Sequence, residues 1–166
     1  MARRIFALVL VALSISATLL IIASLSDLPV RVATQFGFDG AARRWMTRDN
    51  YGISMLLTVT ALPLLLVALL GWLPRVAHRM ISLPYRDYWL DPVRRHGTMG
   101  ALGAFACALG ALTIVFVSVV HLLIVAANAS TPARLSQGAF WTVLILFGIA
   151  VLAWIGALHY RFRAPR

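Results

Sequence analysis

Long apolar blocks alternate with short polar stretches along the chain. Four blocks approach or exceed the roughly 20 residues that a helix needs to cross the hydrocarbon of a bilayer. They cover residues 5–25, 53–73, 101–127 and 139–158, and they contain no Asp, Glu, Lys or Arg. Because a backbone amide in lipid must find its partner within its own segment, each block is predicted to be a helix.

The pattern therefore predicts an all-α membrane protein with a single four-helix domain spanning residues 1–166. The helices are expected over about residues 5–26, 51–73, 92–127 and 138–160. The first block follows two arginines and so also resembles a secretory signal. It is longer than the roughly 7–15 apolar residues of such signals and has no clear cleavage site before Asp27, so we expect an uncleaved helix.

Local signals mark the ends and the centre of the predicted helices. Thr47, Asp49 or Asn50 could each cap the second helix. Pro63, at the centre of that helix, predicts a kink that shapes the packing, with a hinge as the alternative. Asp91 followed by Pro92 is a pairing that helix starts favour, and it predicts that the third helix begins there.

The third helix carries small residues at four-residue spacing, which let another backbone approach closely. Gly100 with Ala104 forms one such set, and Gly103, Cys107 and Ala111 form another. This helix is therefore the expected central element. The sequence leaves open whether it packs within the chain or against a protein partner or second copy.

Composition supports the membrane class. The chain is 61% hydrophobic and only 12% charged, which is too apolar for a soluble domain to cover its own surface. All 15 cations are Arg and all 5 acidic residues are Asp. Such a basic balance would suggest nucleic acid in a soluble protein. Because the charges here flank the apolar blocks, we expect the lipid bilayer as partner and no nucleic acid.

The arginines also predict the orientation of the chain, because cytoplasmic loops of membrane proteins carry the excess of positive charge. Five lie between the first and second helices or between the third and fourth, namely Arg31, Arg43, Arg44, Arg48 and Arg134. Ten lie at the termini and in the middle connection: Arg3, Arg4, Arg75, Arg79, Arg86, Arg94, Arg95, Arg161, Arg163 and Arg166. Both termini are thus expected in the cytoplasm.

No pattern in the sequence predicts a catalytic residue, a cofactor site or a metal site, so we expect a protein that is not an enzyme. The histidines are dispersed, and Cys107 lies within the third helix, where packing is the ordinary role. His121 is the one ionisable residue well inside an apolar block. We expect an interfacial or hydrogen-bonded structural role for it; a proton or metal role and a partner contact are the alternatives.

Two connections have patterns of their own. In the outer one, Leu28, Val30, Val32, Thr34 and Phe36 alternate with polar positions, a Phe-Asp-Gly turn follows, and Trp45 suits the interface. This predicts a short extended element folded over the outer ends of the helices.

In the middle connection, arginines stand beside Tyr85, Tyr88 and Trp89. That combination favours lipid headgroups, with a docking surface for a cytoplasmic protein as the alternative.

The outer stretch LPVRVATQFGFDGAARRWMTR resembles the signature of a small membrane domain of unknown function. That domain also forms the N-terminal part of immunity proteins similar to the sporulation-delaying-protein immunity factor of bacilli. The matching residues are Leu28, Pro29, Val32, Thr34, Phe36, Gly40 and Trp45. A second matching segment contains Leu83, Pro84, Tyr88, Trp89, Leu90, Pro92, Arg94 and Arg95. Gln35 stands where that family usually has His, and the immunity proteins continue beyond four spans.

The resemblance implies a multi-pass protein of a bacterial inner membrane with a non-enzymatic role in immunity, signal relay or interaction. An accessory subunit of a larger membrane complex, for example a respiratory one, is the alternative. A small transporter or intramembrane enzyme is the third class. Transporters often have broken helices or buried charge at mid-membrane, and Pro63 alone hints at this.

The predicted orientation can be tested directly. A tag inserted beside Trp45 should react with a membrane-impermeant reagent on intact cells, because that connection is expected outside. Labelling that occurs only after lysis would show that the orientation is inverted.

Overall fold

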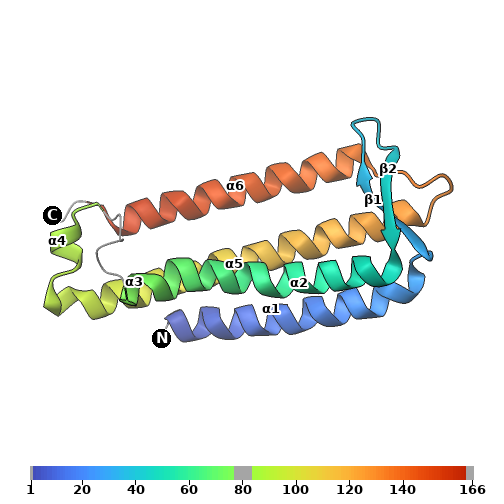
Figure 1. Cartoon of the computed structure of the whole chain (residues 1–166). Helices are drawn as coiled ribbons and strands as arrows, with labels where there is room; N and C mark the ends of the chain where they lie inside the picture. Colours follow the sequence, from blue (N-terminus) through green and yellow to red (C-terminus); the bar gives the residue numbers. More distant parts are fainter. Residues whose placement is uncertain (1, 77–83, 164–166) are drawn as a thin grey trace.

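The computed structural model describes residues 2–76 and 84–163 and contains four long helices that run side by side (Figure 1). They are α1 (Ala2–Ser24), α2 (Arg48–Val67), α5 (Pro92–Asn128) and α6 (Gln137–Arg161). α2 continues as the π-helix η2 (Ala68–Trp72) and the short α3 (Leu73–Val76). The prediction of four helices long and apolar enough to cross a membrane is confirmed.

Shorter elements occupy the two ends of the bundle. The turn η1 (Leu25–Asp27) leads from α1 into an antiparallel hairpin of β1 (Arg31–Phe36) and β2 (Ala42–Thr47). At the opposite end, α4 (Arg86–Trp89) precedes α5. α1 begins and α6 ends at that opposite end, away from the hairpin (Figure 1). Arg79, Leu83 and Arg166, which the sequence placed at the cytoplasmic side, lie outside the described residues.

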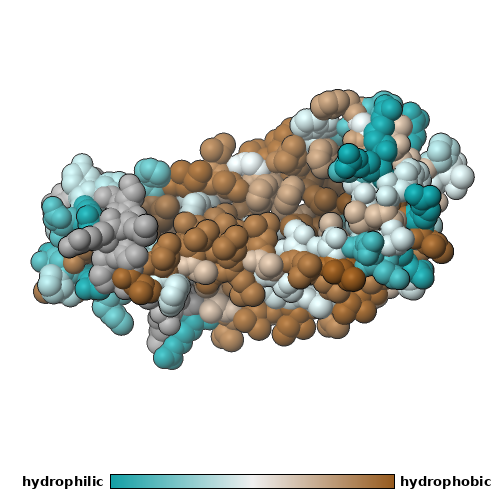
Figure 2. All heavy atoms as spheres, viewed as in Figure 1, coloured by the Kyte–Doolittle hydropathy of each residue, from teal (hydrophilic) through white to brown (hydrophobic). Residues whose placement is uncertain are grey.

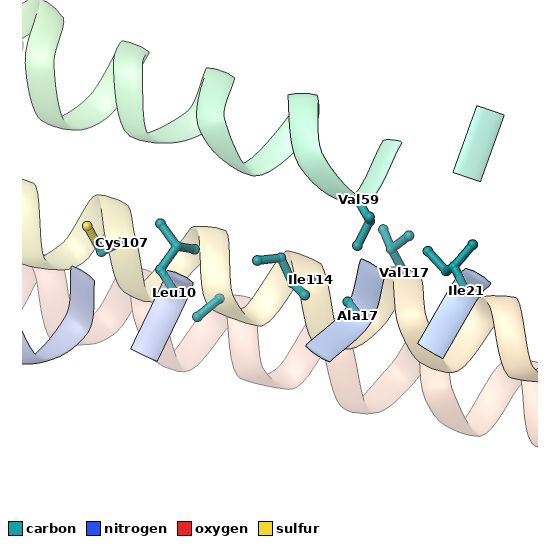
Figure 3. Packing of buried hydrophobic residues seen from close by; sticks show 8 residues of the cluster. Leu10, Ala17, Ile21, Val59, Cys107, Ile114 and Val117 are labelled. Atoms are coloured by element: carbon teal, nitrogen blue, oxygen red, sulfur yellow. The ribbon is translucent and has the colours of Figure 1, made fainter. Parts of the chain in front are cut away.

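α5 is the central element and packs against α1, α2 and α6. Its contacts with α1 and α2 enclose one apolar core in the middle of the bundle (Figure 3). The buried members of this core are Leu10, Ala17, Ile21, Val59, Cys107, Ala111, Ile114 and Val117. α6 is attached differently: over Gln137–Arg161, all of which the structure describes, no residue is buried. Three helices thus form the core and the fourth lies against its outside.

Small residues on α5 lie close to other helices of the same chain at Gly110 and Ala106, and of the predicted sets Gly103 takes part in such a contact, with η2. A Cβ atom added to Gly110 would lie 3.0 Å from Cδ1 of Leu10 and 3.5 Å from the carbonyl oxygen of Pro63. A Cβ atom added to Gly71 of η2 would lie 3.1 Å from the Cβ atom of Ala106. By contrast, a Cβ on Gly100 would meet nothing within 4 Å. A contact with another subunit at Gly100 stays a prediction.

The helix ends follow local sequence. Of the three candidate caps for α2, Thr47 is the N-cap, and its hydroxyl oxygen accepts a hydrogen bond from the Asn50 amide at 3.4 Å. Asp91 accepts from the Val93 amide at 3.0 Å, with Pro92 in the first turn as predicted. α2 continues through Pro63, which removes one backbone hydrogen bond, and the π-helical turn η2 follows after Val67. The kink expected at Pro63 stays a prediction.

The alternating pattern of the outer connection is only partly realised in β1. Val32 is fully buried, whereas Arg31 and Gln35 are exposed, as expected. The prediction is wrong for Val30, which is 75% exposed because it lies in the bend before the strand begins. It also misses Ala33, which is buried against the end of α5. Irregular register after Ala33 and after Gln35 ends the strict two-residue period.

The close contact at Gly110 leads to a stability prediction. Gly110→Val should lower the free energy of unfolding by about 1–3 kcal/mol, because the added methyl groups must displace Leu10 or the α2 backbone. Gly148→Val on α6 is the matched control, since a Cβ there meets nothing within 4 Å. Thermal unfolding in detergent would measure both. Equal melting temperatures for the two variants would contradict the packing.

Candidate functional site

A buried polar network joins α1, α2 and α5 beneath the hairpin. His121 of α5 is 0% exposed. Its Nε2 atom lies 2.7 Å from the hydroxyl oxygen of Ser24, at the end of α1. Its Nδ1 atom lies 2.7 Å from the hydroxyl oxygen of Tyr51, in the first turns of α2, and the two rings stack with centroids 5.7 Å apart. Both ring nitrogens therefore have a partner.

The hydrogen bonds around His121 fix which atoms carry the protons. The Ser24 hydroxyl donates to the carbonyl oxygen of Leu20 at 2.9 Å, so its oxygen is free to accept from Nε2–H of His121. The lone pair of Nδ1 then accepts from the Tyr51 hydroxyl. The opposite tautomer would leave the Tyr51 hydroxyl without an acceptor among the hydrogen bonds of the described residues. Since buried polar groups are almost always satisfied, we assign a neutral imidazole protonated on Nε2.

The ring of His121 is fully buried and hydrogen-bonded to two hydroxyls, which fits the hydrogen-bonded role that we expected. The alternatives of a proton, metal or partner role stay predictions. Ser24 both bonds its preceding turn and reaches a neighbouring helix. Tyr51 carried no such signal in the sequence, because nothing local distinguishes it from an interfacial tyrosine. The network holds three helix ends together.

Asn128, which closes α5, fixes the hairpin to the bundle. Its side-chain oxygen accepts from the Ala33 amide at 2.8 Å. Its side-chain nitrogen donates to the Ala33 carbonyl at 3.0 Å and to the Ile124 carbonyl at 2.9 Å. One amide group thus satisfies both backbone groups of a residue in β1. The sequence signal for this role is an amide side chain at the end of an apolar helix.

The tip of the hairpin is tied to the connection between α5 and α6. The Gln137 side chain donates to the Gly37 carbonyl at 3.0 Å, and the Leu135 amide donates to the Gly40 carbonyl at 3.0 Å. Gly40 has a φ of 75°, and a Cβ there would lie 2.7 Å from the carbonyl oxygen of Leu135. Positive φ and the close backbone both require glycine at this position. The hairpin is therefore held by all four long helices or their ends.

The residues of the outer-loop motif divide into three groups by burial. Leu28 is buried in a second apolar cluster with Val32, Tyr51 and Ile124, and Gly40 is buried at the turn. Thr34 and Phe36 are half-buried on the side of the hairpin that faces α5 and α6. Pro29 and Trp45 are exposed. The buried group positions the hairpin, and the exposed group is available for contacts.

The exposed part of the hairpin combines aromatic and charged side chains. Phe38, at the turn, is 94% exposed, and Trp45 is 46% exposed. Arg43 pairs with Asp39 at 3.0 Å. The Ala41 amide, with a smaller contribution from Arg43, holds the pKa of Asp39 below its usual value, so this carboxylate is charged at neutral pH. Figure 2 shows polar atoms gathered at this end, beyond the apolar band of the helices. Phe38 was not singled out in the sequence.

A hollow of about 470 Å³ lies between the hairpin, the end of α5 and the start of α6. Most of its lining is apolar or aromatic. The lining residues are Thr34, Gln35, Phe36, Gly37, Phe38, Val120, Leu123, Ile124, Leu135, Gln137, Phe140 and Trp141. Sequence reasoning could not find this hollow, because its walls come from three separate segments.

The motif of the middle connection packs against the end of α6. The Trp89 ring meets Phe162 edge-on, with centroids 5.4 Å apart, and the Trp89 carbonyl accepts from the Thr98 hydroxyl at 2.8 Å. The Arg94 guanidinium lies 4.1 Å from the centre of the Tyr88 ring. Pro92 and Arg95 are exposed at the start of α5. Trp89 is half-buried within the chain. A contact of this segment with lipid headgroups stays a prediction.

The described part of the chain brings together no group of three or more His, Cys, Asp or Glu side chains that could hold a metal ion. Cys107 is buried in the central core. Comparison with protein-family models, with curated proteins and with solved structures finds no match to this chain.

The buried network leads to a second prediction. Ser24→Ala and Tyr51→Phe should each lower the free energy of unfolding by about 1–2 kcal/mol, because each leaves one nitrogen of His121 unsatisfied. Ser14→Ala is the control, since the Ser14 hydroxyl bonds only its own helix, at the Leu10 carbonyl, among the bonds that the structure describes. Chemical or thermal unfolding in detergent gives the comparison.

A double-mutant cycle separates the network from simple loss of volume. In a His121→Leu background, Tyr51→Phe should cost little, because no buried nitrogen remains to be satisfied. If Tyr51→Phe costs the same in both backgrounds, the hydrogen bond contributes nothing to stability.

Proposed function

We propose that this chain is a non-enzymatic integral membrane protein that recognises a partner through its hairpin, in a role of the immunity or signal-relay type. The observation that carries the proposal is a rigidly held hairpin with an exposed aromatic tip. Its base is fixed by Asn128 and its turn by Gln137, yet Phe38 is 94% exposed.

A pre-ordered surface of this kind suits recognition. Binding by a loop that is already fixed avoids the entropic cost of ordering it. Aromatic side chains and arginine are enriched among the residues that contribute most to protein interfaces. Phe38 and Trp45 with the neighbouring arginines provide that combination. Nothing within the bundle needs Phe38 to be aromatic, because its ring is almost entirely exposed.

The buried network favours binding over catalysis. Both nitrogens of His121 are taken by hydroxyls, so neither is available to a substrate in this arrangement. The Ser24 oxygen is buried and is bonded to the carbonyl oxygen of Leu20 and to His121. The three groups most able to carry chemistry in the membrane interior are therefore used to join helices.

In the proposed orientation the hairpin faces the outside of a bacterial inner membrane and both termini face the cytoplasm. The bias of arginines toward the termini and middle connection supports it. The arrangement of the helices is compatible, since α1 begins and α6 ends at the end opposite the hairpin (Figure 1). The resemblance to immunity-type proteins is carried by residues such as Leu28 and Gly40, which position the hairpin here.

A second candidate function is that of an accessory subunit in a larger membrane complex. The observation in its favour is α6, which has no buried residue over Gln137–Arg161, together with the open surface at Gly100. A further helix could pack on both. Extraction in mild detergent followed by native mass spectrometry separates the candidates: a stoichiometric complex favours the subunit, and a single chain or homodimer opposes it.

The hairpin proposal predicts site-specific crosslinking. A photoreactive phenylalanine at position 38 should give one discrete crosslinked product in intact cells, and Trp45→Ala should reduce that product about tenfold or more if Trp45 is an anchoring residue. The same amino acid at Ile149, an exposed position on α6, is the control. Equal products at the two positions would mean that the hairpin merely covers the helices.

A further inference from the structure

The hollow under the hairpin lies beside the surface of the helices that faces lipid. Its walls include Leu123 of α5 and Phe140 and Trp141 of α6. Farther along, α6 is held to α5 by the stacked rings of Phe116 and Phe147, whose centroids are 4.2 Å apart. The two helices thus contact each other on the side of the hollow that is away from the hairpin, and the hollow separates them near the hairpin.

The hollow changes from apolar to polar toward the hairpin. Leu123, Phe140 and Trp141 belong to the membrane-crossing helices, whereas Gln35 is an exposed residue of β1. This gradient matches a molecule with a hydrocarbon portion and a polar end. A volume of about 470 Å³ is within the range of about 300–1,000 Å³ that ligand pockets have.

An arginine of the hairpin lies next to the polar wall of the hollow. Arg44 is the cross-strand partner of Gln35, which lines the hollow, although Arg44 itself is not a lining residue. Side chains of paired residues in adjacent strands are neighbours, so the Arg44 guanidinium is within reach of a headgroup at that wall. The residues around the hairpin carry more positive than negative charge: Arg31, Arg43, Arg44, Arg48 and Arg134 against Asp27, Asp39 and Asp49.

We propose that this hollow binds one acyl chain of an anionic phospholipid, with the phosphate of the headgroup beside Arg44. An acyl chain can enter from the bilayer between α5 and α6 without crossing a polar layer. Arg44 beside the hollow then selects the anionic headgroup over a zwitterionic one. Phe38 belongs both to the lining of the hollow and to the exposed tip, whereas Trp45 does not line the hollow. The lipid test uses the isolated chain, so its outcome does not depend on the hairpin recognising a protein.

Native mass spectrometry of the full-length chain, titrated in detergent with phosphatidylglycerol or with phosphatidylcholine, tests the proposal. One phosphatidylglycerol should bind in preference to phosphatidylcholine. Leu123→Trp should weaken that binding about tenfold or more, because an indole in the hollow occupies space that the acyl chain would fill and removes its van der Waals contacts with the walls. Leu122→Trp is the matched control, since Leu122 is exposed on the same helix and does not line the hollow.

The charge at the rim is tested separately. Arg44→Gln should remove the preference for phosphatidylglycerol while leaving the binding of one lipid measurable. Arg31→Gln, which changes an exposed arginine opposite Thr47 in the hairpin, should leave the preference intact. Loss of preference in both variants would show a general effect of charge and would overturn the assignment of the phosphate to Arg44.

Crosslinking on the unmodified chain keeps the proposal testable even if Leu123→Trp fails to fold. Phosphatidylglycerol with a photoreactive acyl chain should label residues 120–124 and 138–141 above the rest of α5 and α6. Uniform labelling along both helices, or a lipid stoichiometry that rises without a first saturable step, would indicate ordinary surrounding lipid and overturn the site. So would a Leu123→Trp variant that folds and binds lipid like the unmodified chain.

Discussion

The packing at the hairpin end of the bundle depends on one constraint. Polar groups buried there among apolar helices must find hydrogen-bond partners within the protein. His121 places an imidazole between three helices, and its two nitrogens are satisfied only if the end of α1 and the start of α2 both reach it. Losing either hydroxyl would leave a buried nitrogen without a partner, which costs more than the bond itself contributes. The position of His121 on α5 therefore fixes which turns of α1 and α2 must lie beside it.

A second polar side chain of α5, Asn128, fixes the position of the hairpin. Asn128 follows His121 by about two helical turns and so lies near the same side of α5. Its amide satisfies both backbone groups of Ala33, so β1 cannot shift without breaking two bonds at once. The hairpin is rigid for this reason, and its exposed aromatic tip is presented in a fixed place. Because α6 is held less closely, a hollow remains between it and the fixed elements.

Much of the architecture could be predicted because its causes are local. Apolar blocks of sufficient length have to be helices in lipid, and the Asp91–Pro92 pair marks a helix start wherever it stands before such a block. The small residues of α5 indicated a close helix contact, but they could not say which helix makes it. The contacts at the site were not predictable in the same way. Ser24 and Tyr51 are separated from His121 by 97 and 70 residues, and no local pattern connects them.

Sequence alone determined that the chain forms four apolar helices, that the outer connection turns at Phe38-Asp39-Gly40, and that α5 can be approached closely. These features follow from hydrophobic length, turn chemistry and side-chain size, which act over a few residues. Only the tertiary structure decided that His121 is enclosed by two hydroxyls, that Asn128 and Gln137 hold the hairpin, and that a hollow remains beside α6. Those outcomes require groups from distant segments to meet, and the packing of whole helices determines which groups do so.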